Sequence, residues 1–507
     1  MNEQDSHCEA AGSQRRWPML SRLLCSLLLA SPLLAEPSVL QALPSARLTP
    51  YEPAAGLAGE FLQRPFTEYF SLHALPGGAR LGWCSFALST PDGSTLRFQE
   101  TTEYRYKLGS AAFEQRTRES WNFDAKPPYA LRSAVRESWM QNKLMKTTLT
   151  RTGQGEYRAE ITEAGEMRAR DFSNLQLTAM DRLGFRLWAV QAGPQRGDCQ
   201  AFRGFDLKNL EPFTERHCIA LLSGDGGVSE IVSENLKDAF TFRYALLPNG
   251  NLAHGVLADA TELRPCTAGE ARNWDRVEDV FTSSLVRSPR ALGAQIKSGQ
   301  SLTMTLTGPG LKSLPRTAFQ KVKLDATGQS ATLLTGPKAG APMPATPEEI
   351  KAALTSPLTL PCKDPRIQRM AREACARAST TEAKVRALLK FVSGFVTDDD
   401  RIKPLGLISV VKNPRGDCTA HALLFTALAR AAGIPCREVS GYLYLSDTAQ
   451  AFGGHAWNEV VIDGHWHPVD PTWNQFNLDA GHIQLTSGSP TPHDAQYFRG
   501  TMRLRME

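Results

Sequence analysis

The sequence lacks several features that would place it in a broad class. No C-x-x-C pair occurs among its ten cysteines, which argues against a structural zinc site. It also lacks a low-complexity tract, a basic helix and an RNP-like motif, and a net charge of +5 is too small to indicate nucleic-acid binding. What remains is a globular composition, 42% hydrophobic and 21% charged. A chain of this length is expected to form about two to four domains.

Residues 1–35 have the pattern of an export signal. Arg22 precedes LLCSLLLASPLLA, an apolar run that ends at Ala35. The run is too short to span a bilayer, and no other segment is a better candidate, so we expect no stable membrane insertion. The pattern predicts a cleaved signal peptide and an exported protein, periplasmic or secreted. Residues 36–65 are rich in proline and alanine and are predicted to form a tether.

Residues 66–335 alternate apolar and polar side chains, which is typical of antiparallel sheets. Strands are predicted at 81–86, 96–98, 104–106, 119–121, 241–244, 277–281, 302–307 and 322–324. The segment GDCQAFRGFD at 197–206 is interpreted as loops and turns. We therefore expect a β-rich region, either one large domain or two domains divided near residue 240.

A linker, GPKAGAPMPATP at 336–347, separates this region from a helical one. Asp364 and Pro365 predict the start of a helix, as N-cap and first helical residue. A second helix is predicted from an apolar stripe at helical spacing, formed by Val385, Leu388, Leu389 and Val392. These two helices are expected to support a third one.

The third predicted helix carries a cysteine in its first turn, in GDCTAHALLFTALARAAGIP. Asp417 is a good N-cap residue, and Gly433 and Pro435 stop the helix. Cys418 therefore lies where unpaired N–H groups and the helix dipole favour a thiolate. This placement makes Cys418 a candidate nucleophile.

A base for this nucleophile is predicted in the hairpin HAWNEVVIDGHWHPVDPT. Asp463-Gly464 is a strong signal for a two-residue turn, which pairs the strands so that Trp457 faces Asp470. Side chains alternate between the faces of a strand, so His455 shares a face with Trp457 and lies diagonal to Asp470. The other two histidines of the segment point to the opposite face. A carboxylate and one imidazole are thus expected to meet.

Cys418, His455 and Asp470, in this order, resemble the transglutaminase-like superfamily of papain-like cysteine enzymes, in its bacterial exported type. The resemblance is carried by RGDCTAHALLFTALARAAGIPCREVSGY, GGHAWNEVVIDGHWHPVDPTW and LDAGHIQL, and covers residues 348–490. It implies an α+β chain in which a transglutaminase-like domain at 348–507 follows the β-rich region. The β-rich layout is similar to the N-terminal regions of some bacterial members, by architecture alone. No cofactor or metal is implied.

The resemblance implies that Cys418 attacks an amide carbonyl of a peptide or protein, with His455 as base and Asp470 orienting the ring. The resulting thioester would be hydrolysed or transferred to an amine. The alternative is an inactive binding or assembly protein of the cell envelope, whose β-rich region recognises an envelope partner. Trp457 and Gly454 are candidates for substrate contact, although Trp457 is also suited to packing around the hairpin.

Two features depart from a simple triad. The oxyanion hole of papain-like enzymes often takes its second donor from an upstream Gln or Trp, and residues 398–417 contain neither. A backbone donor near Asn413 would replace it. His421 follows Cys418 by one turn, so these two residues with His455 and Asp470 form a possible zinc site in place of a triad.

Export would permit disulfides. Removal of residues 1–35 leaves eight cysteines, of which Cys418 is the proposed nucleophile, so at least one more is unpaired. The predicted pairs are Cys199–Cys218 and Cys362–Cys375.

Overall fold

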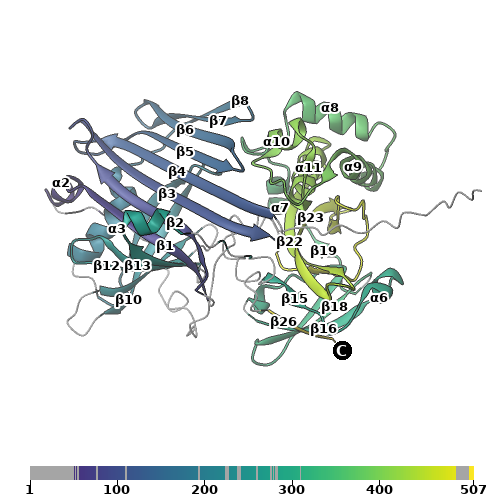
Figure 1. Cartoon of the computed structure of the whole chain (residues 1–507). Helices are drawn as coiled ribbons and strands as arrows, with labels where there is room; N and C mark the ends of the chain where they lie inside the picture. Colours follow the sequence, from purple (N-terminus) through teal and green to yellow (C-terminus); the bar gives the residue numbers. More distant parts are fainter. Residues whose placement is uncertain are drawn as a thin grey trace, which may run out of the picture.

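The computed structural model describes residues 51, 53, 56–486 and 502–506, apart from short gaps (Figure 1). The gaps are at 76–77, 109–110, 192–194, 223–227, 237–240, 259–260, 275–276, 278, 280–283, 309 and 338. The expected signal peptide, part of the tether and most of the strand predicted at 277–281 lie outside the described residues. Strands account for 47% and helices for 21% of the structure, which confirms the α+β class. Within the described part, no helix is long and apolar enough to cross a membrane.

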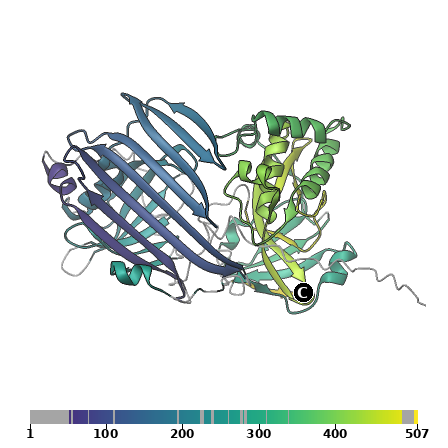
Figure 2. The same ribbon diagram turned by 45° about the horizontal axis from the view of Figure 1, so that its top comes forward.

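Fourteen antiparallel strands form one broad, twisted sheet, seen from two directions in Figures 1 and 2. Across the sheet the order is β8-β7-β6-β5-β4-β3-β2-β1-β14-β13-β12-β11-β10-β9. The strands are β1 (Phe66–Ala74), β2 (Arg80–Ser89), β3 (Thr95–Leu108), β4 (Ala111–Asp124), β5 (Leu131–Met140), β6 (Lys143–Gly153), β7 (Glu156–Glu163), β8 (Glu166–Phe172), β9 (Cys199–Asp206), β10 (Glu211–Leu222), β11 (Val228–Asn235), β12 (Thr241–Leu246), β13 (Leu252–Leu257) and β14 (Thr261–Cys266). Because β11 pairs with β12, residue 240 does not divide two sheets.

Helices α2 (Leu57–Leu62) and α3 (Ala179–Gln191) pack against this sheet. Leu62 and Leu183 share a core with Trp121, and Trp188 of α3 shares a second core with Phe70. Helix α2 lies within residues 36–65, the segment predicted as a tether. The prediction is wrong for the residues of this helix, because its apolar side chains are buried against the sheet.

The C-terminal part combines a second sheet with helices (Figure 1). Its strand order is β19-β24-β23-β22-β25, and β15 pairs with the start of β23. The strands are β15 (Val286–Arg287), β19 (Met343–Pro344), β22 (Cys436–Ser446), β23 (Ala451–Ile462), β24 (His465–Val469) and β25 (His482–Gln484). The helices are α7 (Pro347–Ala353), α8 (Pro365–Ala374), α9 (Thr381–Phe395), α10 (Leu407–Lys412) and α11 (Cys418–Ala431). The predicted linker thus contributes β19 to this sheet.

Helix α11 lies at the centre of the C-terminal part. Every residue from Cys418 to Ala429 is buried. Its apolar side chains share one core with α8, α9 and strand β23, and that core contains the predicted stripe of α9. The expectation that two helices support the cysteine helix is confirmed.

A small sheet of order β17-β18-β16-β26 packs beside the C-terminal sheet. Its strands are β16 (Leu302–Thr307), β17 (Gln320–Leu324), β18 (Ser330–Thr335) and β26 (Arg503–Met506). The remaining short elements are α4 (Ala268–Arg272), α6 (Gly293–Lys297), η2 (Leu311–Ser313) and a parallel pair, β20 (Thr397–Asp398) with β21 (Arg415–Gly416). The small sheet shares its core with Tyr442 and Phe452, so its residues pack with the C-terminal part rather than with the large sheet alone.

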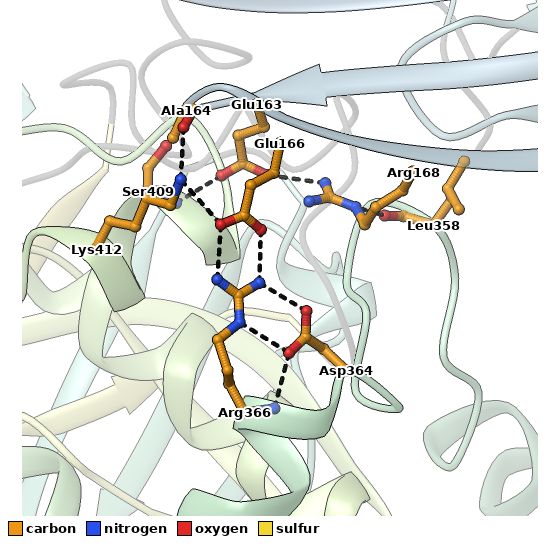
Figure 3. A network of polar contacts seen from close by, with 9 residues as sticks. All are labelled: Glu163, Ala164, Glu166, Arg168, Leu358, Asp364, Arg366, Ser409 and Lys412. Carbon is orange, nitrogen blue, oxygen red and sulfur yellow. Dashed lines mark hydrogen bonds and ion pairs between the residues drawn. The ribbon is translucent and has the colours of Figure 1, made fainter.

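The β3–β4 and β7–β8 hairpins of the large sheet both touch the C-terminal part, as does Gln141 in the β5–β6 turn. Tyr106 and Phe113, near the tip of the β3–β4 hairpin, enter the core around Tyr442. The second contact is polar and lies at the β7–β8 hairpin (Figure 3). There Glu166 receives two hydrogen bonds from Arg366, at 2.7 and 2.6 Å, and lies 2.9 Å from Lys412.

Glu163, in the same hairpin, is fully buried. One carboxylate oxygen accepts a hydrogen bond from the backbone N–H of Ser409 at 2.8 Å, and the other accepts one from Arg168 at 2.9 Å (Figure 3). Helix α10 has Gly406 as N-cap and no side-chain cap of its own. The carboxylate of Glu163 therefore caps α10 from a distant part of the chain. Helix α10 in turn leads to the segment that holds Cys418.

Some local predictions were wrong. Residues 199–206 of the segment interpreted as loops and turns form strand β9, which pairs with β10 along its whole length, and the strands predicted at 96–98 and 104–106 are one strand, β3. Gly204 makes the first pairing possible, because a Cβ there would lie 2.2 Å from the ring of Phe213. Within β9 and β10, Cys199 and Cys218 form the predicted disulfide.

The second predicted disulfide is absent, and both Cys362 and Cys375 are free. Helix α8 separates them, and its ten residues extend about 15 Å along the axis. A disulfide requires Cα atoms within about 7 Å. The helix that the sequence predicted between the two cysteines is thus the reason they do not pair.

Candidate active site

The start of helix α11 is built as predicted. Asp417 is the N-cap residue, and its carboxylate accepts a hydrogen bond from the backbone N–H of Thr419 at 3.2 Å. Its other oxygen pairs with Lys403 at 3.0 Å, and both side chains are buried. Cys418 is the first residue of the helix, with an exposed fraction of only 1%. The sulfur is therefore held at a helix N-terminus whose cap is itself fixed by a buried cation.

The hairpin has the predicted register. Ile462 pairs with His465 and Asn458 pairs with Val469 across the turn. Beyond this pair, Nε2 of His455 donates a hydrogen bond to Oδ2 of Asp470 at 2.8 Å. Both side chains are buried. Burial alone would raise the pKa of Asp470, but the two neighbouring histidines outweigh it and hold that pKa well below its usual range.

Cys418 contacts this hairpin at Ala456, the residue that follows His455. The sulfur packs with Ala422 and Ala456, and the backbone N–H of Ala456 donates a hydrogen bond to it. Nδ1 of His455 is buried and has no hydrogen-bond partner among the described residues. Since Nε2 already serves Asp470, Nδ1 is the ring nitrogen left to exchange a proton with a thiol.

The surroundings of Cys418 oppose the predicted thiolate. Burial and, after it, the Asp417 carboxylate raise the pKa of Cys418 well above its ordinary value. A helix dipole stabilises an adjacent anion by about 0.3–1 kcal/mol, whereas full burial shifts a pKa by up to roughly 3–5 units. Burial dominates, so this closed arrangement favours the neutral thiol.

Two tryptophans flank His455. The ring of Trp473 stacks on it, with centroids 4.9 Å apart and planes at 14°, and Trp473 is 37% exposed. Trp457 is fully buried and packs with Phe319, Val439 and Leu478. In this arrangement Trp457 supports the site from inside, and Trp473 is the side chain at its outer boundary. Gly454 is also buried, in β23 opposite Tyr442.

Sequence reasoning missed two residues of the site, Asp479 and His482. His482 starts β25, and its Nε2 lies 3.3 Å from Oδ2 of Asp470 while its Nδ1 lies 3.0 Å from Oδ1 of Asp479. The carboxylate of Asp470 therefore lies within hydrogen-bond distance of two imidazoles. The signal was present in LDAGHIQL, which contains both residues, but their contact with Asp470 depends on the pairing of β25 with β22.

The arrangement also bears on metal binding. The two ring nitrogens of His421 lie 3.0 Å from the carbonyl oxygen of Asp417 and 3.1 Å from that of Val396, so this ring is not directed at the zinc site considered above. Ligand-type atoms of His455, Asp470 and His482 lie within 4.8 Å of one another. Hydrogen bonds already connect these three groups, so the ligand-type atoms that face one another have partners without a metal ion.

Asp398 is a further carboxyl group near the site. It lies in β20, which pairs with Gly416 of β21, just before Asp417. Burial, followed by the Asp417 charge, raises the pKa of Asp398 to about 6, and the charge of His455 opposes this shift. Its Oδ1 is buried without a hydrogen-bond partner among the described residues.

Part of the chain is similar to proteins of a known family. Residues 368–471 match the model of the transglutaminase-like superfamily. The chain is 37% identical over 94 residues to kyphoscoliosis peptidase of Mus musculus, and 37% identical over 87 residues to that of Homo sapiens. These alignments cover 18% and 16% of this chain, and only 14% and 13% of the two relatives.

Similar solved structures include a candidate cysteine protease from Cytophaga hutchinsonii, 16% identical, with a TM-score of 0.27 over 41% of this chain and 84% of that one. Another is a candidate protease from Parabacteroides distasonis, 9% identical, with a TM-score of 0.18 over 70% of this chain and 69% of that one. The family match includes Cys418, His455 and Asp470. The chain therefore contains a domain of the transglutaminase-like superfamily.

Proposed function

We propose that the protein is a cysteine-nucleophile enzyme that acts on amide bonds of peptides or proteins. The observation that carries the proposal is the convergence of three groups from distant positions. The sulfur of Cys418 accepts a hydrogen bond from Ala456, the neighbouring His455 keeps Nδ1 unbonded, and Asp470 orients that ring through Nε2. The family match over residues 368–471 adds support.

In the proposed reaction, Nδ1 of His455 takes the thiol proton as the sulfur of Cys418 attacks the amide carbonyl carbon. Asp470 stabilises the imidazolium that forms. The backbone N–H of Cys418 is one donor for the developing oxyanion. The C–N bond then breaks, the amine leaves with the proton from His455, and a thioester remains on the sulfur. Water releases an acid, whereas a second amine forms a new amide.

Substrate entry requires movement at the site, because Cys418 and His455 are each only 1% exposed. Trp473, which covers the ring of His455 and is partly exposed, is the side chain we expect to shift first. A thiol that stays neutral until the substrate arrives fits this closed state, since proton transfer to His455 then accompanies attack.

The same closed state favours a second candidate function. A buried, neutral Cys418 is also what a protein would show if it kept the fold and lost the chemistry. In that case the large sheet would bind a partner of the cell envelope, and the C-terminal part would serve assembly. Export, to the periplasm or beyond the cell, belongs to both proposals, and the Cys199–Cys218 disulfide is compatible with it.

A peptide library digested in the presence of a fluorescent primary amine tests the proposal. New peptide ends score hydrolysis, and fluorescent peptides score transfer. Cys418→Ala should abolish both, while Cys436→Ala, which removes another buried thiol of the same domain, should preserve both. Turnover that survives in Cys418→Ala would refute the nucleophile, and a folded parent protein with neither activity would favour the binding function.

A further inference from the structure

Asp470 is held by more groups than a simple triad requires. Its Oδ2 faces Nε2 of His455 at 2.8 Å and Nε2 of His482 at 3.3 Å. Its Oδ1 accepts a hydrogen bond from the backbone N–H of Thr472 at 2.8 Å. All of these side chains are buried. The carboxylate thus has a fixed position, and the second imidazole has no assigned role in the proposed reaction.

Both ring nitrogens of His482 contact carboxylate oxygens, since Nδ1 lies 3.0 Å from Oδ1 of Asp479. An ionised carboxylate only accepts hydrogen bonds, so both nitrogens must carry protons for both contacts to be favourable. His482 is therefore a buried imidazolium between two carboxylates. Burial lowers its pKa, but Asp479 and Asp470 outweigh burial and raise the pKa of His482 to about 9.

Asp479 is itself fixed by a closed ring of contacts. It accepts hydrogen bonds from the backbone N–H of Gly481 at 3.0 Å and from Nε2 of Gln475 at 3.2 Å. The backbone of Gln475 pairs with that of Asp470 in both directions, at 2.8 and 2.9 Å. The chain from 470 to 482 is thus closed on itself through the side chains of Asp479 and His482.

The sheet leaves little freedom for this arrangement. Strand β22 lies between β23, which carries His455, and β25, which carries His482. Its Gly441 has no room for a side chain, because a Cβ would lie 1.9 Å from the carbonyl oxygen of Ile483 and 2.6 Å from the ring of Trp457. Trp457 contacts both imidazoles, with centroids 5.8 Å from His455 and 5.5 Å from His482. The two rings therefore reach Asp470 from one face of the sheet.

We propose that Asp479 and His482 are positioning residues, which hold Oδ2 of Asp470 against Nε2 of His455 so that Nδ1 of His455 is the nitrogen that receives the Cys418 proton. This inference rests on the proposed function for its catalytic consequence, and on the contacts above for its geometry. The triad is thereby extended to a hydrogen-bonded network of two carboxylates and two imidazoles, Asp470, Asp479, His455 and His482, next to the thiol of Cys418.

The charges in this network also offset one another. The titratable groups facing His482 are Asp479 on its own segment, Asp470 on the segment after β24, and His455 on β23. The positive ring of His482 offsets the charge of Asp470. Without that ring, Oδ2 of Asp470 would lose one of its two imidazole partners, and the hydrogen bond that fixes the Nε2–H tautomer of His455 would be less firmly held. A contact that only closed the loop would change stability and leave the tautomer of His455 unchanged.

The test uses the full-length Cys418→Ala protein with ¹⁵N-labelled histidine, followed by NMR from pH 5 to pH 10, so that no activity is needed. In the parent, His482 should stay doubly protonated at pH 7 and lose a proton near pH 9. In His482→Gln and Asp479→Asn, the ¹⁵N shifts of the neutral His455 ring should move from the Nε2–H tautomer toward a mixture of the two tautomers, because Oδ2 of Asp470 is less firmly held against Nε2. His467→Gln is the matched control, because this ring lies in the same hairpin but faces Phe476, Glu382 and Arg386 instead of Asp470.

Kinetics provide the second readout. In the protein with Cys418 intact, kcat should fall in His482→Gln and Asp479→Asn with KM little changed, because the ring of His455 is less often in the tautomer that can accept the thiol proton. A singly protonated His482 at pH 7, or an unchanged His455 tautomer in both folded variants, would overturn the inference. Shifted ¹⁵N signals in a protein that turns over no substrate would instead count against the proposed function and leave the positioning geometry intact.

Discussion

Replacing Glu163 by alanine should loosen helix α10 without unfolding the large sheet. The substitution removes the carboxylate that caps α10 through Ser409 and leaves the guanidinium of Arg168, 13% exposed, without its ion-pair partner, although it keeps its hydrogen bond to the carbonyl oxygen of Leu358 (Figure 3). The helix has no other side-chain cap. Its backbone N–H groups would then lose their charged acceptor at a site that water reaches poorly.

The magnitude follows from the contacts. A hydrogen bond to a charged group contributes about 1.5–3 kcal/mol, and breaking a buried ion pair costs about 3–5 kcal/mol. We therefore expect the free energy of local opening at Ser409 to fall by about 2 kcal/mol, and the free energy of unfolding of the C-terminal part to fall by more. A change of about 2 kcal/mol corresponds to a roughly 30-fold faster exchange of the Ser409 amide.

Hydrogen–deuterium exchange, read by mass spectrometry over peptides from 404 to 418, measures this directly. Glu160→Ala is the control, because Glu160 lies in the same strand and its ion pair, with Arg158, is at the surface. Surface pairs contribute about 0–1 kcal/mol, so exchange in α10 should not change. Since α10 leads to Cys418, turnover should fall in Glu163→Ala and not in the control. Equal exchange of α10 in both variants would refute the capping argument.

Three further outcomes are expected. Hydrogen bonds from its cationic partners lower the pKa of Glu166 to about 2, so the stability it contributes is present above pH 4.5 and lost as the pH falls toward 2; Glu166→Gln should remove this dependence from acid unfolding curves. Reduction of Cys199–Cys218, a separation of 19 residues, should destabilise the large sheet by about 3 kcal/mol in urea titrations, and an unchanged midpoint would contradict this. Burial and, among nearby charges, Asp398 raise the pKa of Cys418, so Asp398→Asn should speed its alkylation by up to about tenfold; a slower rate would exclude the proposed electrostatic effect.

Several features could be predicted because they depend on neighbours in the chain. The Asp463-Gly464 turn determines the strand pairing on both sides of it, so the meeting of His455 with Asp470 followed from local geometry. Asp417 could be recognised as the N-cap of α11 for the same reason, because capping needs only the first turn of a helix.

Other features required partners that are distant in the sequence. Segment 197–206 has weak strand signals of its own and becomes β9 only because β10 pairs with it. His482 reaches Asp470 because β25 pairs with β22, and Glu163 caps α10 across the contact between the two parts of the molecule. Neither hydrophobic periodicity nor residue spacing in the sequence predicts these long-range contacts.

The sequence by itself determined the order of the candidate nucleophile, base and carboxylate, and the local elements that carry them. Only the tertiary structure decided that Cys418 is buried, which raises the pKa of its thiol, and that Asp470 contacts two imidazoles. The physical reason is the distance along the chain over which each interaction acts. Turn and capping preferences act over a few residues, whereas desolvation and the pairing of distant strands depend on the whole packed chain.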